Sequence, residues 1–196
     1  DLAPDAALSD VVDALADMDA RSIHETARLI DLDGLEALID AVSGAGHVYA
    51  MGNGSAHAAA VYLELKLRSL GVATSTFRDM ASAIIGISLA RPGDVVVVVT
   101  PTGIARESVP MLTEANRRGC VTVAITGNSR SAAAEIAQHC LVTVQAESRL
   151  RTGVLSSMIA SLFLSDCISS GLVIRRHDRS VSALAAVDEA MRNYYW

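Results

Sequence analysis

Five consecutive valines, Val95 to Val99, constrain the fold of this chain more than any other feature. A strand with one face in water alternates apolar and polar residues, whereas an unbroken apolar run is typical of a strand covered on both faces. Valine is also enriched in strands because its branched side chain fits a pleated surface. We therefore expect this run to be a central strand with helices on both faces of its sheet.

Strand-like runs and helical patterns alternate through the middle of the chain. Short apolar runs predict five strands, and apolar residues spaced by three and four predict a helix between each successive pair. This alternation predicts βαβ units with right-handed crossovers and a parallel sheet. The predicted strands cover residues 47–51, 73–77, 94–100, 121–126 and 140–144, and the predicted helices between them cover residues 56–69, 80–89, 105–118 and 131–139.

Helical patterns also occupy both ends of the chain. Residues 6–43 predict two or three helices, and residues 154–173 and 181–194 predict one helix each. The stretch 153–174 is long and mostly apolar, but it contains Asp166 and several serines, so we expect a core or subunit-interface helix and no membrane contact. This stretch and the apolar face of residues 6–18 predict a homodimer or homotetramer.

Composition excludes several classes of protein. The chain has 196 residues, enough for one domain with a core. Hydrophobic residues make up 51% and charged residues 19%, which excludes a disordered chain. The net charge of -6 argues against a nucleic-acid-binding surface, which needs clustered cations. A small basic group, Arg175, Arg176 and Arg179, is interpreted as a solvated loop.

The cysteines and the first residue bear on location. Cys120, Cys140 and Cys167 are widely spaced among apolar neighbours, which predicts buried thiols in a reducing compartment. Neither they nor the five scattered histidines predict a metal site. The chain begins at Asp1 without a signal-peptide pattern, so we expect a cytoplasmic segment of a longer protein.

Two loops that follow predicted strands carry the functional signal. Gly52-Asn53-Gly54-Ser55 follows the first strand and precedes a helix, whose free N–H groups and positive dipole end favour an anion. Thr100-Pro101-Thr102-Gly103 follows the valine strand and also precedes a helix. In an open parallel sheet both loops lie at the carboxyl ends of strands, where ligands bind. Together they predict a phosphate-binding site.

These loops, with Ile125-Thr126-Gly127-Asn128-Ser129 and the stretch from Leu150 to Ser157, resemble a sugar isomerase (SIS) phosphosugar-binding domain. The last stretch, Leu-Arg-Thr-Gly-Val-Leu-Ser-Ser, is similar to the Phe-Arg-Ser-Gly-Ala-Met-Ser-Ser typical of RpiR-type bacterial transcriptional regulators. The resemblance implies an α/β fold: a flavodoxin-like, three-layer α/β/α domain with a five-stranded parallel sheet in the order 2-1-3-4-5. It also implies a helical lead-in and dimerisation segment over residues 1–34 and an SIS domain over residues 35–196.

The resemblance implies a phosphosugar effector and no cofactor or metal. DNA would be bound only through a module absent from these residues. Two departures remove hydroxyl donors: alanine stands at positions 56 and 105, where the family often has hydroxyl side chains. The implied phosphate contacts are Gly52, Asn53, Gly54, Ser55, Thr100, Thr102 and Gly103, and the further candidates for ligand contact are Arg78, Asp79, Arg151, Ser156 and Ser157.

Each further candidate has an alternative structural role. Arg78 and Asp79 could form an ion pair at the end of a strand, and Ser156 and Ser157 could cap the following helix. Arg151 could hold a carboxylate in place of an anionic ligand.

Two other functions remain open at this point. A phosphosugar aldose-ketose isomerase needs a general base and a proton donor near the ligand. Glu147 and His57 are the candidates for those roles, although His57 also fits an ordinary helix face. A degenerate SIS domain used only for oligomerisation is the third hypothesis. We favour the effector domain of an RpiR-type regulator, because sensing requires binding alone.

Overall fold

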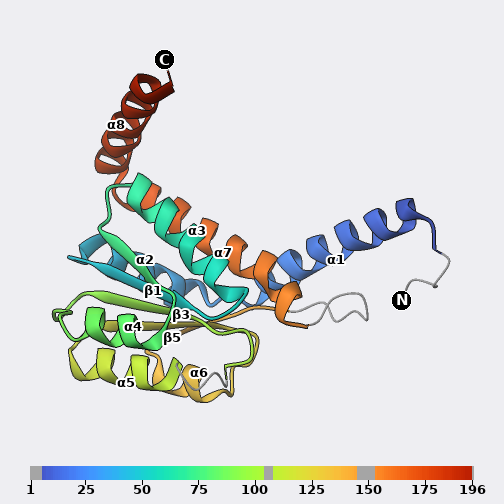
Figure 1. Ribbon diagram of the computed structural model, residues 1–196, viewed down its shortest axis with the longest axis horizontal. Helices are drawn as coiled ribbons and strands as arrows, with labels where there is room; N and C mark the ends of the chain where they lie inside the picture. The colour runs from blue at the N-terminus through green and yellow to red at the C-terminus, as the bar shows by residue number, and fades with distance from the viewer. Residues whose placement is uncertain (1–5, 104–107, 145–152, 196) are drawn as a thin grey trace.

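A single parallel sheet organises the computed structural model, which describes residues 6–103, 108–144 and 153–195. The five strands lie in the order β2-β1-β3-β4-β5, and every neighbouring pair is parallel. This order and the layers on either side confirm the predicted flavodoxin-like architecture (Figure 1). The strands are β1 (Val48–Gly52), β2 (Thr74–Phe77), β3 (Val95–Val99), β4 (Val121–Thr126) and β5 (His139–Val142).

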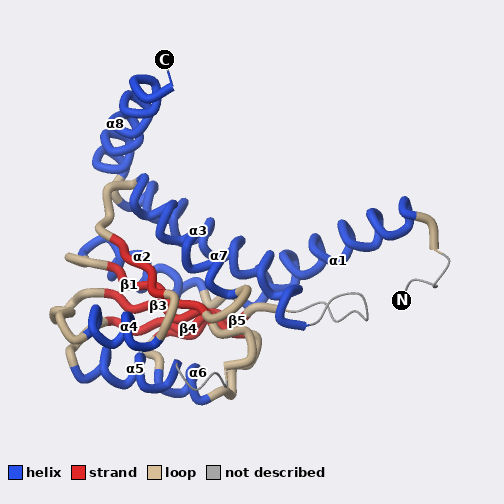
Figure 2. The backbone as a smooth tube through the Cα atoms, in the orientation of Figure 1, coloured by secondary structure: helices blue, strands red, loops and turns tan. Residues whose placement is uncertain are grey.

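Helices cover both faces of the sheet (Figure 2). The valine strand β3 lies centrally, with every residue at most 3% exposed, as predicted. Its residues alternate between two cores: Val97 packs in one with Leu38 and Leu63, and Val98 packs in the other with Met111. The first core is closed by α2 (Leu32–Gly44), α3 (Ala56–Ser69) and α7 (Gly153–Arg175), and the second by α4 (Met80–Ile87), α5 (Ser108–Arg117) and α6 (Ala132–Ile136).

Helix α7 is a core helix. By length and composition alone, Met158–Arg175 could cross a membrane. However, Leu164, Ile168 and Leu172 recur every fourth residue and are at most 1% exposed in the core beside α2 and α3. This packing confirms the first of the two roles predicted for this stretch, a core helix or a subunit-interface helix.

Two helices project from this body (Figure 1). Among the described residues, the second half of α1 (Leu8–Leu29) is anchored by two hydrogen bonds to Val144. Ser22 Oγ donates to the carbonyl of Val144 at 2.6 Å, and Thr26 Oγ1 accepts from the N–H of Val144 at 2.9 Å. Helix α8 (His177–Tyr195) contacts α7 and α3 and then extends away from the sheet.

The arginines between α7 and α8 do not form the predicted solvated loop. Arg175 ends α7 and donates to Asp40 at 2.9 Å. Arg176 reaches under the junction and donates to the carbonyls of Ser43 at 3.5 Å and Leu70 at 3.2 Å, at the ends of α2 and α3. Arg179 is already in α8. Helix carboxyl ends carry a partial negative charge, so the half-buried guanidinium of Arg176 between two of them is stabilised.

The cysteines agree with prediction only in part. Cys120 is buried, whereas Cys140 and Cys167 are half-buried, and all three are unpaired. Burial raises the pKa of each thiol, which keeps the three side chains in the neutral form at pH 7.

Candidate functional site

The first two predicted loops start side by side at the carboxyl edge of the sheet. Gly52, the last residue of β1, is paired with Val99, the last residue of β3. From β1 the chain crosses to β2 on one side of β1, and β3 lies on the other side. The strand order therefore reverses between β1 and β3. Ligands of open α/β sheets bind in the crevice at such a point.

The loop after β1 needs glycine at two positions for different reasons. A Cβ on Gly52 would lie 2.3 Å from the carbonyl oxygen of Ala56, so this glycine lets β1 meet the start of α3. Gly54 has a φ of +59°, and a Cβ there would meet nothing within 4 Å. The left-handed backbone at Gly54 therefore faces open space, which a ligand could occupy.

Backbone donors remain available in this loop. Within the described part of the chain, no group accepts a hydrogen bond from the N–H of Asn53 or Gly54. Both groups precede the N-terminus of α3, where the helix dipole is positive. This loop can therefore bind an anion through its backbone.

The loop after β3 contributes a hydroxyl. Thr100 is only 3% exposed, and its Oγ1 has no hydrogen-bond partner among the described residues. An unpaired buried hydroxyl costs free energy, on the order of 1 to 3 kcal/mol, so such groups usually have a partner when the protein works. A ligand oxygen between the two loops would supply that partner.

The loop after β3 is held in place by the loop after β4. Gly103 has a φ of +68°, and a Cβ there would lie 2.1 Å from Ser131 Oγ. The N–H of Gly127 donates to the carbonyl of Pro101 at 2.9 Å, and Thr126 Oγ1 accepts from Asn128 N at 3.2 Å. Thr126 and Ser131 are thus supporting residues, which the sequence patterns did not single out as such.

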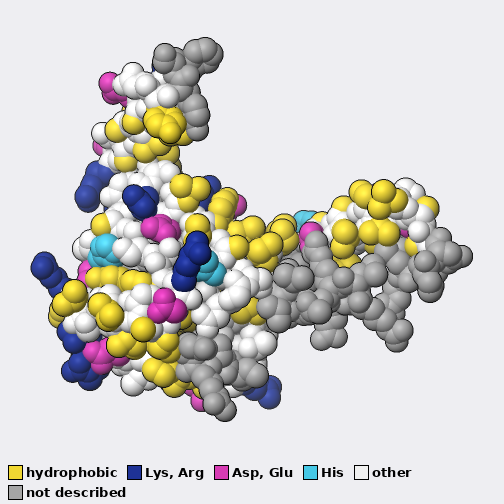
Figure 3. All heavy atoms as spheres, viewed as in Figure 1, with side chains coloured by type: hydrophobic (Ala, Val, Ile, Leu, Met, Phe, Trp, Pro, Cys, Tyr) yellow, Lys and Arg dark blue, Asp and Glu magenta, His cyan; other side chains and the backbone are white. Residues whose placement is uncertain are grey.

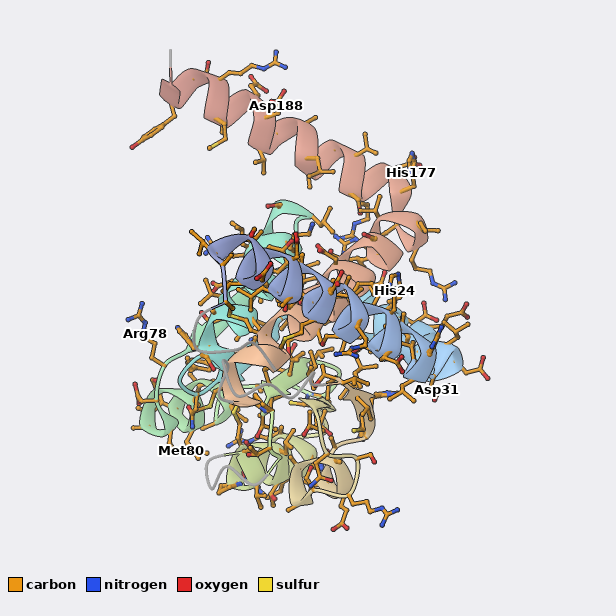
Figure 4. The ribbon with its side chains drawn as sticks, turned by 90° about the vertical axis from the view of Figure 1, so that its right-hand side faces the viewer. His24, Asp31, Arg78, Met80, His177 and Asp188 are labelled. Atoms are coloured by element: carbon orange, nitrogen blue, oxygen red, sulfur yellow. The ribbon has the colours of Figure 1, made fainter. Side chains whose placement is uncertain are left out.

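Of the two candidates after β2, Asp79 has a structural role. Asp79 is the N-cap of α4: its Oδ1 accepts from the N–H of Ser82 at 2.8 Å. These hydrogen bonds hold the pKa of Asp79 below its usual range. Arg78 is exposed, points away from the body in Figure 4 and forms no ion pair with Asp79. The alternative of a strand-end ion pair is therefore wrong, and a ligand contact from either residue stays a prediction.

The remaining candidates lie at four places in the chain. His57 is half-buried in the first turn of α3, and its Nδ1 is buried without a partner among the described residues. Ser156 and Ser157 lie in the first two turns of α7, and their side chains lie outside the described part of the structure. Glu147 and Arg151 lie outside the described residues. Thr102 is exposed on its loop, and Ser55 immediately precedes α3.

Metal binding has no support in the described part of the chain. It contains no group of three histidine, cysteine, aspartate or glutamate side chains arranged to hold an ion.

Comparison with known proteins places this arrangement in a family context. Residues 42–168 match the family model of the SIS domain. An uncharacterized HTH-type transcriptional regulator of Clostridium perfringens is 25% identical over 87% of this chain and 61% of its own length. A second, from Haemophilus influenzae, is 27% identical over 81% of this chain and 55% of its own length. The chain therefore spans only a little over half the length of these curated relatives.

Solved structures agree with these matches. A structure of the Vibrio vulnificus NanR protein complexed with ManNAc-6P has a TM-score of 0.88 and 23% identity, and the match covers 95% of this chain and 70% of that one. The sugar isomerase domain of an RpiR transcription factor from Sphaerobacter thermophilus has a TM-score of 0.79 and 28% identity, with 87% and 94% covered. The fold is shared with proteins of this kind.

Proposed function

The chain belongs to the SIS domain family, and on that premise we propose that it is the effector-binding part of an RpiR-type transcriptional regulator of carbohydrate metabolism. The similarity to HTH-type regulators over most of this chain supports the proposal. Those relatives extend well beyond the matched region, which is consistent with a separate DNA-binding module. In this proposal residues 1–34 are the lead-in, residues 35–196 bind the effector, and the protein acts on DNA in the cytoplasm.

The effector in this proposal is a sugar phosphate. Its phosphate accepts hydrogen bonds from the N–H groups of Asn53 and Gly54 and from the hydroxyl of Thr100. The observation that carries the proposal is the buried, unpartnered Thr100 Oγ1 at the switch point between β1 and β3. Ser55, Thr102 and Gly103 complete this phosphate-binding site, which we call the cradle. The sugar extends toward the remaining predicted contacts, which are Arg78, Asp79, Arg151, Ser156 and Ser157.

A hydrogen-bonded route connects this cradle to the lead-in helix. The carbonyl of Thr126, the last residue of β4, accepts from the N–H of Thr143 at 2.9 Å. The next residue, Val144, is bound at both backbone groups by Ser22 and Thr26 of α1. We infer that ligand-induced movement of the cradle changes the position of α1. Only a ligand that binds two arrangements of α1 with different affinity can shift the balance between them.

Thermal unfolding with a panel of sugar phosphates tests the proposal. ManNAc-6P is the first probe because the NanR structure contains it. A ligand that binds only the folded state raises the melting temperature as its concentration rises. We expect at least one sugar phosphate to do so, and the corresponding unphosphorylated sugar to have no effect. If no compound of the panel stabilises the protein, the proposal is contradicted. The remaining hypothesis is then a degenerate SIS domain used only for oligomerisation.

A matched pair of threonine variants tests the site itself. Thr100→Val removes the unpartnered hydroxyl while it keeps the shape, and we expect about a tenfold to hundredfold loss of affinity if the bond is to a charged oxygen. Thr143→Val is the control, because its hydroxyl is also buried and unpartnered but follows the edge strand β5. Equal affinity of Thr100→Val and the unaltered protein contradicts the site. Turnover of a ketose phosphate that disappears in Glu147→Gln would instead support an isomerase.

A further inference from the structure

Helix α8 exposes one continuous apolar stripe. The stripe consists of Val181, Leu184, Val187, Met191 and Tyr194, spaced by three and four residues and each at least 40% exposed. An apolar line at this spacing on one side of a helix is typical of a helix that packs against another helix. Ser180, at the base of α8, is fully buried, so the body covers only the start of this helix.

Beside the α8 stripe lies an open groove. The α3–α8 groove has a volume of about 490 Å³. Its apolar part comes from Val61 and Leu65 of α3, which are 41% and 62% exposed, and from Val187 of α8. Its polar part contains Glu64 and Arg68, which form an ion pair along α3 at 3.4 Å. On the face shown in Figure 3, hydrophobic side chains gather along α8 and over the neighbouring part of the body.

We propose that the α3–α8 groove is filled by α8 of a second copy of this chain, lying antiparallel to α3. The same helix that forms one wall of the groove would then fill the groove of the partner. Such an arrangement is isologous and closes at two copies, as the commonest symmetric oligomers do. The inference concerns assembly only and does not depend on the proposed sugar phosphate.

Charge complementarity favours a second copy and sets its direction. Helix α3 has its acid, Glu64, one turn before its base, Arg68. Helix α8 repeats this order beside its stripe, with Asp188 and Arg192 paired at 2.6 Å. In an antiparallel arrangement Arg68 lies opposite Asp188 of the partner subunit, and Glu64 lies opposite the partner's Arg192. A parallel arrangement would place like charges together, which is unfavourable.

One antiparallel register satisfies the charged and the apolar contacts together. With Arg68 opposite Asp188 of the partner subunit, Leu65 lies opposite the partner's Met191. These apolar side chains are 62% and 47% exposed in one copy, so both lose contact with water when the copies join. The projecting half of α1 fits this groove less well: it carries Asp10, Asp13 and Asp17 and no base before Arg21, so it has nothing to pair with Glu64.

Sedimentation of the whole chain over a range of concentrations tests the proposal. We expect a dimer whose dissociation constant rises at least tenfold in Leu65→Asp and in Met191→Asp. The matched control is Leu89→Asp in the turn after α4, a leucine 74% exposed on the opposite face of the sheet, which should leave the dimer unchanged. A monomer at every concentration overturns the proposal, and so does a dimer that both groove variants leave intact.

Charge reversal tests the register. Arg68→Glu and Asp188→Arg should each weaken the dimer, because each places like charges across the interface. The double variant should restore it, since an acid at position 68 then lies opposite a base at position 188 of the partner subunit, while Glu64 still lies opposite the partner's Arg192. Failure of this rescue overturns the antiparallel register. A disulfide between separately tagged chains, one with Leu65→Cys and the other with Met191→Cys, supports it independently; no cross-link between them contradicts it.

Discussion

Helices α7 and α8 follow one another with only Arg176 between them, yet they have opposite environments. Helix α7 has 23 residues and packs in the core, whereas α8 has 19 residues and extends into solvent. The difference lies in their apolar residues: α7 places them around most of its circumference, and α8 in one stripe. A helix that is apolar all round is buried, as α7 is in the core. A helix with a single apolar stripe, such as α8, can remain exposed until that stripe packs against another helix.

Removal of core side chains from α7 should have the largest effect on stability. Ile168→Ala leaves a cavity at a residue that is 1% exposed, and we expect the free energy of unfolding to fall by about 2 to 5 kcal/mol. Urea denaturation measures this. Ile174→Ala on the same helix is the control, because Ile174 is 81% exposed and its truncation should change stability by less than about 0.5 kcal/mol. Equal losses would contradict the assignment of α7 to the core.

Substitution of Arg176, the residue between α7 and α8, should have the next largest effect on stability. Arg176→Met removes the hydrogen bonds to the carbonyls of Ser43 and Leu70, and we expect a loss of about 2 kcal/mol in unfolding free energy. Hydrogen exchange should also become faster in the first turns of α8. Arg175→Met is the control, since its ion pair with Asp40 is exposed and should contribute less than about 1 kcal/mol. A larger effect of the control would contradict the role of Arg176.

The anchor of α1 should have a smaller effect on stability. Thr26→Val removes the acceptor for the N–H of Val144, and we expect a loss of about 1 kcal/mol in thermal or urea unfolding. Thr113→Val is the control, because its exposed hydroxyl bonds only to the carbonyl of Val109 in its own helix. If α1 moves with the cradle, ligand binding changes the rate at which a protease cleaves α1, and we expect this change to differ between Thr26→Val and the unaltered protein. The same change in both proteins would contradict a connection between α1 and the ligand site.

The smallest effect concerns the charged contact between α3 and α7. Asp166 accepts from Lys66 Nζ and Tyr62 Oη, both at 2.9 Å. Burial raises the pKa of Asp166, but these hydrogen bonds outweigh it and hold the pKa below 3.8. The carboxylate therefore stabilises the fold above about pH 4, and this contribution is lost as pH falls through the folded-state pKa.

We expect Asp166→Asn to cost less than about 1 kcal/mol at pH 7, because the pair is partly exposed. The difference from the unaltered protein should shrink as the pH falls below 4, as measured by urea denaturation at several pH values. A difference that is the same at pH 7 and pH 3 would contradict the charged interaction as its source.

The layered sheet was predictable because its signals are local. The valine run and the alternating periods predict the strands, and helix α3 has the predicted bounds. The predicted ends of β5 and α6 were less accurate, because β5 begins at His139, inside the predicted helix 131–139. In that region Gln138 N donates to Thr122 Oγ1 of β4, a contact between residues far apart in sequence that no periodicity shows.

The candidate site was predictable in position but not in detail. Glycines after the first strand and hydroxyls after the third predicted two facing loops, and the pairing of Gly52 with Val99 places them side by side. The roles of Asp79 as a cap and of Ser131 against Gly103 depend on side-chain directions and on long-range packing. Those are absent from a pattern of residue types.

The amino-acid sequence by itself determined the parallel sheet, the order of its helices and the edge at which two anion-binding loops meet, because periodicity and turn residues act over a few neighbouring positions. Only the tertiary structure decided that the Thr100 hydroxyl is buried without a partner, that Arg176 joins the ends of α2 and α3, and that α8 leaves the body. Each of these depends on how residues far apart in the sequence pack together, as Arg176 does with Ser43 and Leu70.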